Sequence, residues 1–302
     1  MLIGLREKLL RAQTKFQPYM VDGVPRRVRE TFKRYDEIRG YGGYLKRCQK
    51  ACKRPIPQTN SSLIANHYDL IDVFSNDEAE TLRKEAFSLS DDFDYRRGKE
   101  NKATLKVPDG AFFDKVLEQV FSDETDARLL EYFGSEYVPF WCGMEQTEVS
   151  TANKRAFLWH CDKGPSKWAK VLLYFTSVAD TGGNSVLIDA KTTDAISALD
   201  YTFGPAKERT SDLAELAKQH DIDFEPMSFD VKAGQALLFE PARLLHHGQL
   251  PNKAPRTIMQ ILILPSPRPW REALARLRNA DLASRNDFSF PSHARDLEAV
   301  LR

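Results

Sequence analysis

Two clusters of polar residues, far apart in the chain, restrict the folds that this sequence can adopt. His160 and Asp162 are separated by one residue, while His246, His247 and Arg256 follow only after a long interval. In an extended segment, side chains two residues apart point the same way, so His160 and Asp162 can face one point while Cys161 faces elsewhere. A histidine from the second cluster can join them only in a fold that brings distant strands together, such as the mouth of a β-barrel.

These residue types suit a metal ion. Two imidazoles and one carboxylate form a facial site that leaves three coordination positions of an iron(II) ion open. The triplet His160-x-Asp162 alone is weak evidence, and a single histidine is more often a surface or core residue than a ligand. Arg256 makes the set more specific, because a protein that only binds a metal does not need this additional cation.

Length and composition place the chain among soluble globular proteins. It has 302 residues, of which 42% are hydrophobic and 29% are charged, enough to bury a sizeable core. No apolar run approaches the roughly 18 residues of a membrane span, and the first residues lack a signal-peptide pattern. We therefore expect a cytoplasmic protein. Four cysteines are too few and too scattered for a disulfide framework.

The charges are distributed unevenly along the chain. Residues 1–54 contain 15 lysines and arginines but only five acids, although the whole chain carries a net charge of only +1. A segment this basic favours an anionic partner: a membrane surface, nucleic acid, a phosphorylated substrate or carrier, or the acidic remainder of the same protein.

The first 133 residues have helical patterns. Apolar residues at helical spacing predict a helix over 1–16, a second over 26–53 with an interruption near 40–43, and further helices over 76–89 and 111–133. Asn76 is the expected N-cap of the third helix. A stretch rich in proline, asparagine and serine within 55–62 predicts a linker. We therefore predict a basic helical N-terminal extension over 1–58 and a second unit over 59–302.

From about residue 137 the pattern becomes that of β-strands. Short β-branched and aromatic runs separated by turns predict a sandwich or barrel. The expected strands are 137–141, 146–149, 170–175, 185–188, 229–231, 236–239 and 257–264. A helical insertion is expected over 194–219 and an amphipathic helical tail over 270–302.

The order of these motifs resembles the iron(II)/2-oxoglutarate-dependent dioxygenases. The matching residues are Trp159-His160-Cys161-Asp162, the strand 170–175, Gly182-Gly183, the run 234–239, His247-Gly248, Asn252 and Arg256. The Trp-His-x-Asp form and the helical insertion are most similar to the phytanoyl-CoA hydroxylase-like branch, whereas the spacing from His247 to Arg256 is closer to that of the prolyl hydroxylases. The resemblance covers residues 137–265. It implies an α+β fold whose core is a double-stranded β-helix, a jelly-roll or cupin-like barrel, with a helical N-terminal extension, a helical insertion and a C-terminal helix.

The resemblance also implies roles for individual residues. His160, Asp162 and His247 would bind iron(II), and Arg256 would pair with the distal carboxylate of 2-oxoglutarate, which a guanidinium group can bind through two hydrogen bonds. Tyr174 falls where the family often has a residue beside 2-oxoglutarate. Because His246 and His247 are neighbours, only one of them can point inward. Gly248 and the spacing to Arg256 favour His247, and His246 is the alternative.

The predicted function is that of an oxygenase that uses iron(II), 2-oxoglutarate and O2 to hydroxylate a small-molecule substrate, with release of succinate and CO2. Asp162 argues against a halogenase, because related halogenases lack this carboxylate. The basic segment 1–54 is compatible with an anionic or carrier-linked substrate and with peripheral contact to an anionic membrane; nucleic acid is a less favoured partner. Two alternatives are a cupin-like metal-binding protein without 2-oxoglutarate, and a protein with an inactive barrel that binds polyanions or membrane surfaces.

Overall fold

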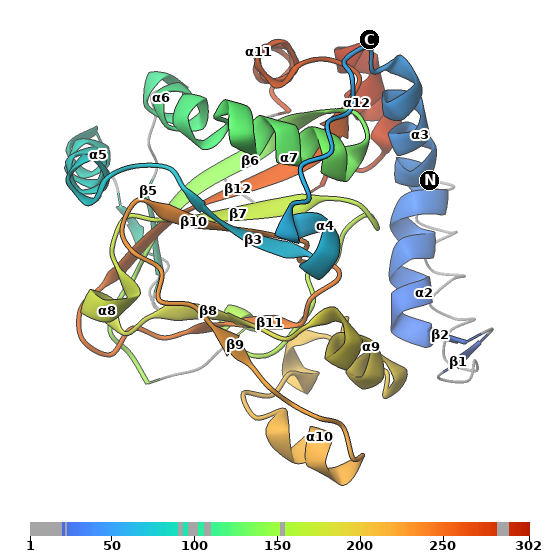
Figure 1. Cartoon of the computed structure of the whole chain (residues 1–302), viewed down its shortest axis with the longest axis vertical. Coiled ribbons are helices and arrows are strands. Elements are labelled where there is room, and N and C mark those ends of the chain that lie inside the picture. The colour runs from blue at the N-terminus through green and yellow to red at the C-terminus, as the bar shows by residue number, and fades with distance from the viewer. Residues whose placement is uncertain are drawn as a thin grey trace.

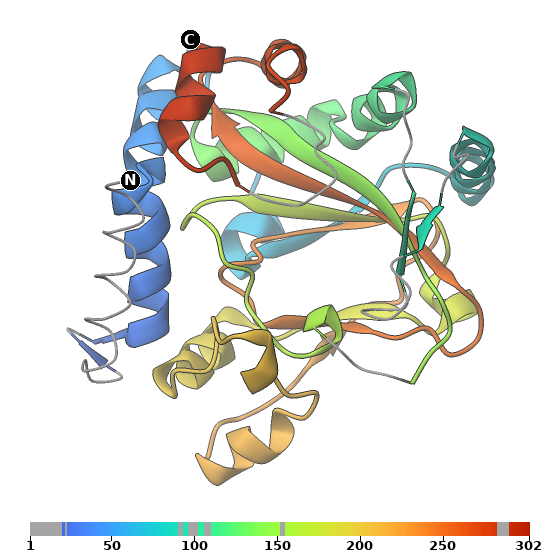
Figure 2. The ribbon, with the colours of Figure 1, turned by 180° about the vertical axis from the view of Figure 1, so that it is seen from behind.

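The computed structural model describes residues 20–21, 23–89, 93–95, 102–105, 110–151, 155–282 and 290–302. Two sheets face each other at the centre of the molecule, and helices cover the outer side of the larger sheet (Figures 1 and 2). The helix predicted over 1–16 lies outside the described residues. None of the helices in the described ranges is long and apolar enough to span a membrane.

The larger sheet has seven antiparallel strands in the order β3-β10-β7-β12-β6-β5-β4. Its strands are β3 (Tyr68–Asp72), β4 (Phe93–Tyr95), β5 (Lys102–Leu105), β6 (Glu136–Thr147), β7 (Ala169–Tyr174), β10 (Gln235–Phe239) and β12 (Arg256–Ser266). The strands predicted over 137–141 and 146–149 are one continuous strand, β6, which pairs with β12 along almost its whole length. Strand β3 was not predicted.

The smaller sheet has the order β11-β8-β9, with strands β8 (Asn184–Leu187), β9 (Met227–Ser228) and β11 (His246–Gln249). An isolated antiparallel bridge between His160 and His246 extends it. The strand predicted over 229–231 is wrong, because sheet pairing ends at Ser228 and the carbonyl of Phe229 accepts a hydrogen bond from the Asn184 side chain instead.

The chain alternates between the two sheets. It passes from β6 in the larger sheet to the His160 bridge beside the smaller one, returns in β7, crosses to β8 and β9, returns in β10, crosses to β11 and ends the barrel in β12. This alternation is that of a double-stranded β-helix, so the predicted α+β fold class is confirmed. It also brings the segment around residue 160 next to residue 246.

The helices are α2 (Arg26–Phe32), the π-helix η1 (Lys33–Ile38), α3 (Tyr41–Ala51), α4 (Ser62–Asn66), α5 (Asn76–Leu89), α6 (Gly110–Val120), α7 (Asp123–Phe133), α8 (Val178–Thr181), α9 (Ala190–Ala198), α10 (Ala214–Gln219), α11 (Trp270–Asn279) and α12 (Ala294–Leu301). Two 3-10 turns, η2 (Arg155–Phe157) and η3 (Ala206–Glu208), and a small ribbon of β1 (Met20–Val21) and β2 (Val24–Pro25) complete the described elements.

Several predicted helix boundaries differ from the observed ones. The helix predicted over 111–133 is two helices, α6 and α7, and the predicted insertion begins earlier, with α9. Helix α5 has the predicted bounds, but its cap is Ser75 rather than Asn76, since Ser75 and Glu78 exchange hydrogen bonds. Of the predicted linker, only its last residue, Ser62, belongs to a helix, α4, which Ser61 caps. The interruption near residue 40 occurs at Gly40, whose φ of 79° is unfavourable for residues with a Cβ.

The described part of the basic segment lies against acidic groups of the barrel unit. Arg26 and Arg27 both pair with the buried Asp200. Arg54 pairs with Asp126, and Arg47 with Glu298. In addition, the Tyr44 hydroxyl donates a hydrogen bond to a backbone carbonyl at the end of β12, 2.9 Å away. The acidic body of the same protein is therefore one partner of these basic residues.

Candidate functional site

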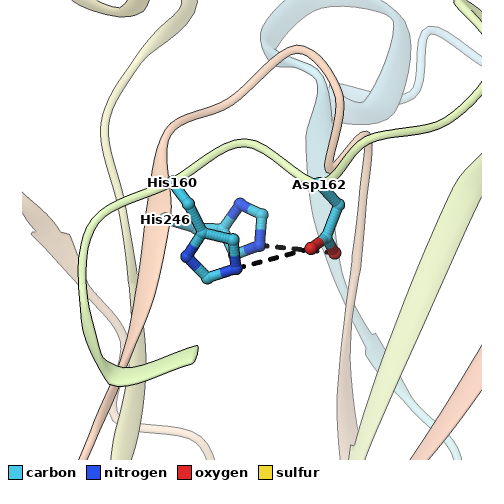
Figure 3. A group of neighbouring side chains, drawn as sticks. All are labelled: His160, Asp162 and His246. Carbon is cyan, nitrogen blue, oxygen red and sulfur yellow. Dashed lines mark ion pairs between the residues drawn. The ribbon is translucent and has the colours of Figure 1, made fainter. Parts of the chain in front are cut away.

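Three side chains converge where the chain crosses between the two sheets. His160 Nε2 lies 3.4 Å from Asp162 Oδ1, and His246 Nε2 lies 3.6 Å from Asp162 Oδ2. One donor atom from each residue lies within 4.8 Å of the other two, a spacing at which one metal ion could be held (Figure 3). The two histidine rings point toward the same carboxylate from neighbouring backbone segments.

Backbone pairing produces this convergence. His160 and His246 exchange two hydrogen bonds, with N–O distances of 3.0 and 2.9 Å, in an antiparallel bridge. Side chains of directly paired residues lie on the same face, which brings the two imidazole centres to within 4.5 Å. The Asp162 amide donates to the Pro241 carbonyl at 2.8 Å, which ties the aspartate to the segment after β10.

Hydrogen bonds on the far side of each ring orient the imidazoles. His160 Nδ1 is 2.6 Å from the Leu158 carbonyl, and His246 Nδ1 is 2.9 Å from the Leu244 carbonyl. A carbonyl can only accept, so each Nδ1 carries the proton, and in a neutral ring the Nε2 lone pair then points toward Asp162. Metal-binding histidines commonly have this arrangement.

Burial and neighbouring charges determine the protonation of the site. Burial, followed by the nearby His246, lowers the pKa of His160 to about 4, so the ring is neutral at pH 7. Burial alone would raise the pKa of Asp162. The Lys170 ammonium is the largest influence that opposes burial, and the pKa of this carboxyl is held well below its usual range. The site thus offers an ionised carboxylate and a neutral His160.

The structure does not bring His247 into this group. In β11, neighbouring side chains point to opposite faces, so His247 points away from Asp162. Its ring packs edge-on against Trp159 with the centres 4.2 Å apart, and its Nδ1 lies 2.9 Å from the Gly248 carbonyl. The structure therefore groups His246, and not the expected His247, with His160 and Asp162, because the bridge to His160 places His246 on the inner face.

Arg256 and Tyr174 lie further along the barrel, near β8. Arg256 is 3% exposed, and its Nη1 donates to the Asn184 carbonyl at 2.5 Å. Its Nε is buried and has no hydrogen-bond partner within the described ranges. The Tyr174 hydroxyl, also buried, donates to Ser185 at 3.0 Å, and the guanidinium of Arg256 lies 5.7 Å from the Tyr174 ring. A buried guanidinium whose Nε–H has no partner in the described ranges can bind an anionic group by donating a hydrogen bond to it.

Sequence reasoning missed Lys170. Its ammonium is within hydrogen-bond distance of Asp162 Oδ2, and its side chain is only 11% exposed. Lys170 is the second residue of β7 and lies on the same face of the strand as Leu172 and Tyr174, so all three face the barrel interior. The signal in the sequence was a lysine at an alternate position of an otherwise apolar strand, on the same side as the inward-facing residues.

The inner face of the larger sheet carries more polar groups near Lys170. Gln260 of β12 pairs with Leu172 of β7 and shares its face. The Gln260 amide donates to Glu145 of β6 at 2.7 Å, and both side chains are partly exposed. These groups and Lys170 make part of the barrel interior polar.

No protein-family model matches the chain, and neither does any curated protein.

Among solved structures, the chain is similar to the non-heme alpha-ketoglutarate-dependent carbocyclase SnoK from nogalamycin biosynthesis, with 12% identity over 76% of this chain and 92% of that chain and a TM-score of 0.47. EctD from S. alaskensis in its apoform is 14% identical over 70% of this chain and 82% of that chain, with a TM-score of 0.46. HygX from Streptomyces hygroscopicus with nickel and 2-oxoglutarate bound is 17% identical over 75% and 94%, with a TM-score of 0.45. Identities this low do not establish a shared chemistry.

Proposed function

We propose that this protein is an iron(II)- and 2-oxoglutarate-dependent oxygenase that acts on a small-molecule substrate. The iron ligands are His160, Asp162 and His246, and Arg256 binds the distal carboxylate of 2-oxoglutarate. Hydroxylation is the proposed outcome, and the cytoplasm is the proposed location.

One observation carries the proposal: three electron-pair donors converge on one point in a buried site. The Nε2 atoms of His160 and His246 face the ionised carboxylate of Asp162, and all three donor atoms lie within 4.8 Å of one another. Lone pairs directed at a carboxylate repel it unless a cation lies between them. Two imidazoles and one carboxylate are the ligands expected for a non-heme iron(II) site with open positions.

The Arg256 side chain supports a dicarboxylic cosubstrate. Its guanidinium is buried near Tyr174 and Asn184, and its Nε has no hydrogen-bond partner among the residues that the structure describes. A buried donor without a partner costs free energy, so a carboxylate at this position would satisfy it. A metal site without 2-oxoglutarate would supply no carboxylate to accept this hydrogen bond.

Bound iron, 2-oxoglutarate and O2 would supply the oxidising chemistry, with succinate and CO2 as products. The protein residues would act mainly by position. The carbonyls of Leu158 and Leu244 hold the two imidazoles in their ligand form. The Pro241 carbonyl and Lys170 orient Asp162, and the apolar residues Leu172, Leu187 and Ile258 exclude water from the interior.

The test uses the purified full chain loaded anaerobically with iron(II). On exposure to O2, it should convert 2-oxoglutarate to succinate even without a primary substrate. Asp162→Ala should abolish this turnover and weaken metal binding by about 100-fold or more, because it removes a direct ligand. A wild-type protein that binds neither iron(II) nor 2-oxoglutarate would refute the proposal.

The adjacent histidines provide a matched pair. We expect His246→Ala to lose iron(II) binding as Asp162→Ala does. His247→Ala should change the iron(II) dissociation constant by less than about threefold, since His247 contacts Trp159 rather than the cluster. The reverse result would restore His247 as the ligand.

A further inference from the structure

Lys170 gives the candidate metal site an unusual charge balance. Its ammonium contacts Asp162 Oδ2, while His160 Nε2 is closest to the other oxygen, Oδ1. With both imidazoles in their neutral ligand form, the carboxylate supplies one negative charge and Lys170 one positive charge. The three ligands and Lys170 together are therefore neutral, whereas the same ligands without the lysine would carry a net charge of −1.

The lysine is held in this position by the barrel. Its backbone pairs with Phe239 of β10 and Leu262 of β12, at the centre of the larger sheet. The ammonium lies 6.0 Å from the Phe239 ring and 5.9 Å from the Trp168 ring, so aromatic faces line its surroundings. The Phe239 ring also packs on His246, with the ring centres 5.1 Å apart. With its side chain only 11% exposed, Lys170 has little water to screen its charge.

We propose that Lys170 makes metal retention depend on the anionic cosubstrate, an inference that rests on the proposed function. A dication held by the three ligands is repelled by the ammonium that touches one of them. Without the lysine, the dication and its three ligands carry a net charge of +1. A bound 2-oxoglutarate dianion changes this net charge to −1, so the same ammonium then stabilises the assembled pair. Lys170 thus acts as a positioning residue for Asp162 and, through its charge, couples the binding of metal and oxo acid.

The coupling can be measured without turnover. The full chain is titrated with Mn²⁺ by isothermal titration calorimetry, with and without saturating 2-oxoglutarate, and the coupling factor is the ratio of the two dissociation constants. By linkage, the same factor describes the effect of Mn²⁺ on 2-oxoglutarate binding. Chelation alone makes this factor greater than one, and Lys170 should increase it further.

Lys170→Met should tighten Mn²⁺ binding without 2-oxoglutarate and lower the coupling factor by about tenfold or more, as expected for a poorly screened charge near the ion. Lys170→Gln is a second neutral variant in case the methionine protein does not fold. Lys170→Arg keeps the charge and should retain most of the coupling. Lys167→Met is the matched control: this lysine lies over the Tyr132 ring at 3.6 Å rather than against Asp162, and its loss should leave the factor unchanged.

Two results would overturn the inference while leaving the proposed function intact. One is a coupling factor in the neutral variants within about twofold of wild type, even if Mn²⁺ binding itself weakens, because Lys170 would then only orient Asp162. The other is an equal loss of coupling in Lys170→Arg, which would show that shape rather than charge matters. Failure of the wild-type protein to bind Mn²⁺ with 2-oxoglutarate would overturn both.

Discussion

The two faces of the larger sheet use the same strands for different purposes. On the outer face, Val171 and Leu173 of β7 and Met259 and Ile261 of β12 are each 0% exposed and belong to a large apolar core with the helices. On the inner face, the alternate positions include the partly exposed Lys170 and Gln260 beside a much smaller apolar cluster. The outer face is closed to water at these four positions, and the inner face retains polar groups in a confined space.

The two faces therefore contribute differently to stability and to the candidate site. Burial of apolar area on the outer face supplies much of the stabilisation, and any cavity there is costly. The inner face can carry Lys170, Gln260 and Arg256 because the outer face holds the strands in place. Substitutions on the two faces should therefore separate loss of folding from loss of ligand binding.

The largest expected effect on stability is on the outer face. Ile261→Ala should lower the free energy of unfolding by about 2–5 kcal/mol, since it leaves a cavity between the sheet and the helices. Urea denaturation measures this loss. The neighbouring inner-face change Gln260→Ala is the matched control and should cost less than about 1 kcal/mol. Equal costs at the two positions would show that the two faces contribute equally to stability.

Arg256→Met should raise the dissociation constant of 2-oxoglutarate by about 10- to 100-fold, because a charge-assisted hydrogen bond to a carboxylate is lost. Calorimetric titration of the Mn²⁺-loaded protein measures it. Mn²⁺ binding alone should change by less than about threefold. If metal binding fell as far as 2-oxoglutarate binding, Arg256 would have a structural role instead.

Tyr174→Phe should cost about 1 kcal/mol of unfolding free energy. The change removes the hydrogen bond to Ser185 and leaves that buried hydroxyl without its donor. Ser185→Ala in the same background should recover part of the loss, and a double-mutant cycle of thermal unfolding measures the coupling. A coupling near zero would mean that this inner-face hydrogen bond contributes nothing to stability.

The smallest effect is expected outside the barrel, where α2 contacts the insertion. Arg26→Ala should lower the unfolding free energy by no more than about 1 kcal/mol, since the Arg26 side chain is partly exposed and Arg27 continues to pair with Asp200. Asp200→Ala removes the shared partner and should cost more. Thermal unfolding distinguishes the two, and a larger loss for Arg26→Ala would contradict this arrangement.

Much of the fold could be predicted because its elements have strong local patterns. Strands β7, β8, β10 and β12 are apolar runs bounded by turns, and α5 has a clear periodicity and acidic first turn. Strand β11 was missed because it consists of two histidines, a glycine and a glutamine, and β3 because two aspartates interrupt its apolar residues. They are strands because β10 and β8 supply hydrogen-bonding partners, which no local pattern records.

The residue types of the candidate site are evident from the sequence alone: the His160-x-Asp162 pair, a later histidine doublet and a following arginine. The sequence also determined that only one histidine of the doublet could face inward, because side chains alternate along a strand. Only the tertiary structure decided that His246 is that histidine and that Lys170 contacts Asp162. Alternation along a strand does not say which of two neighbouring side chains faces the barrel interior. Here that choice is made by backbone hydrogen bonds between His160 and His246, which lie far apart in the chain.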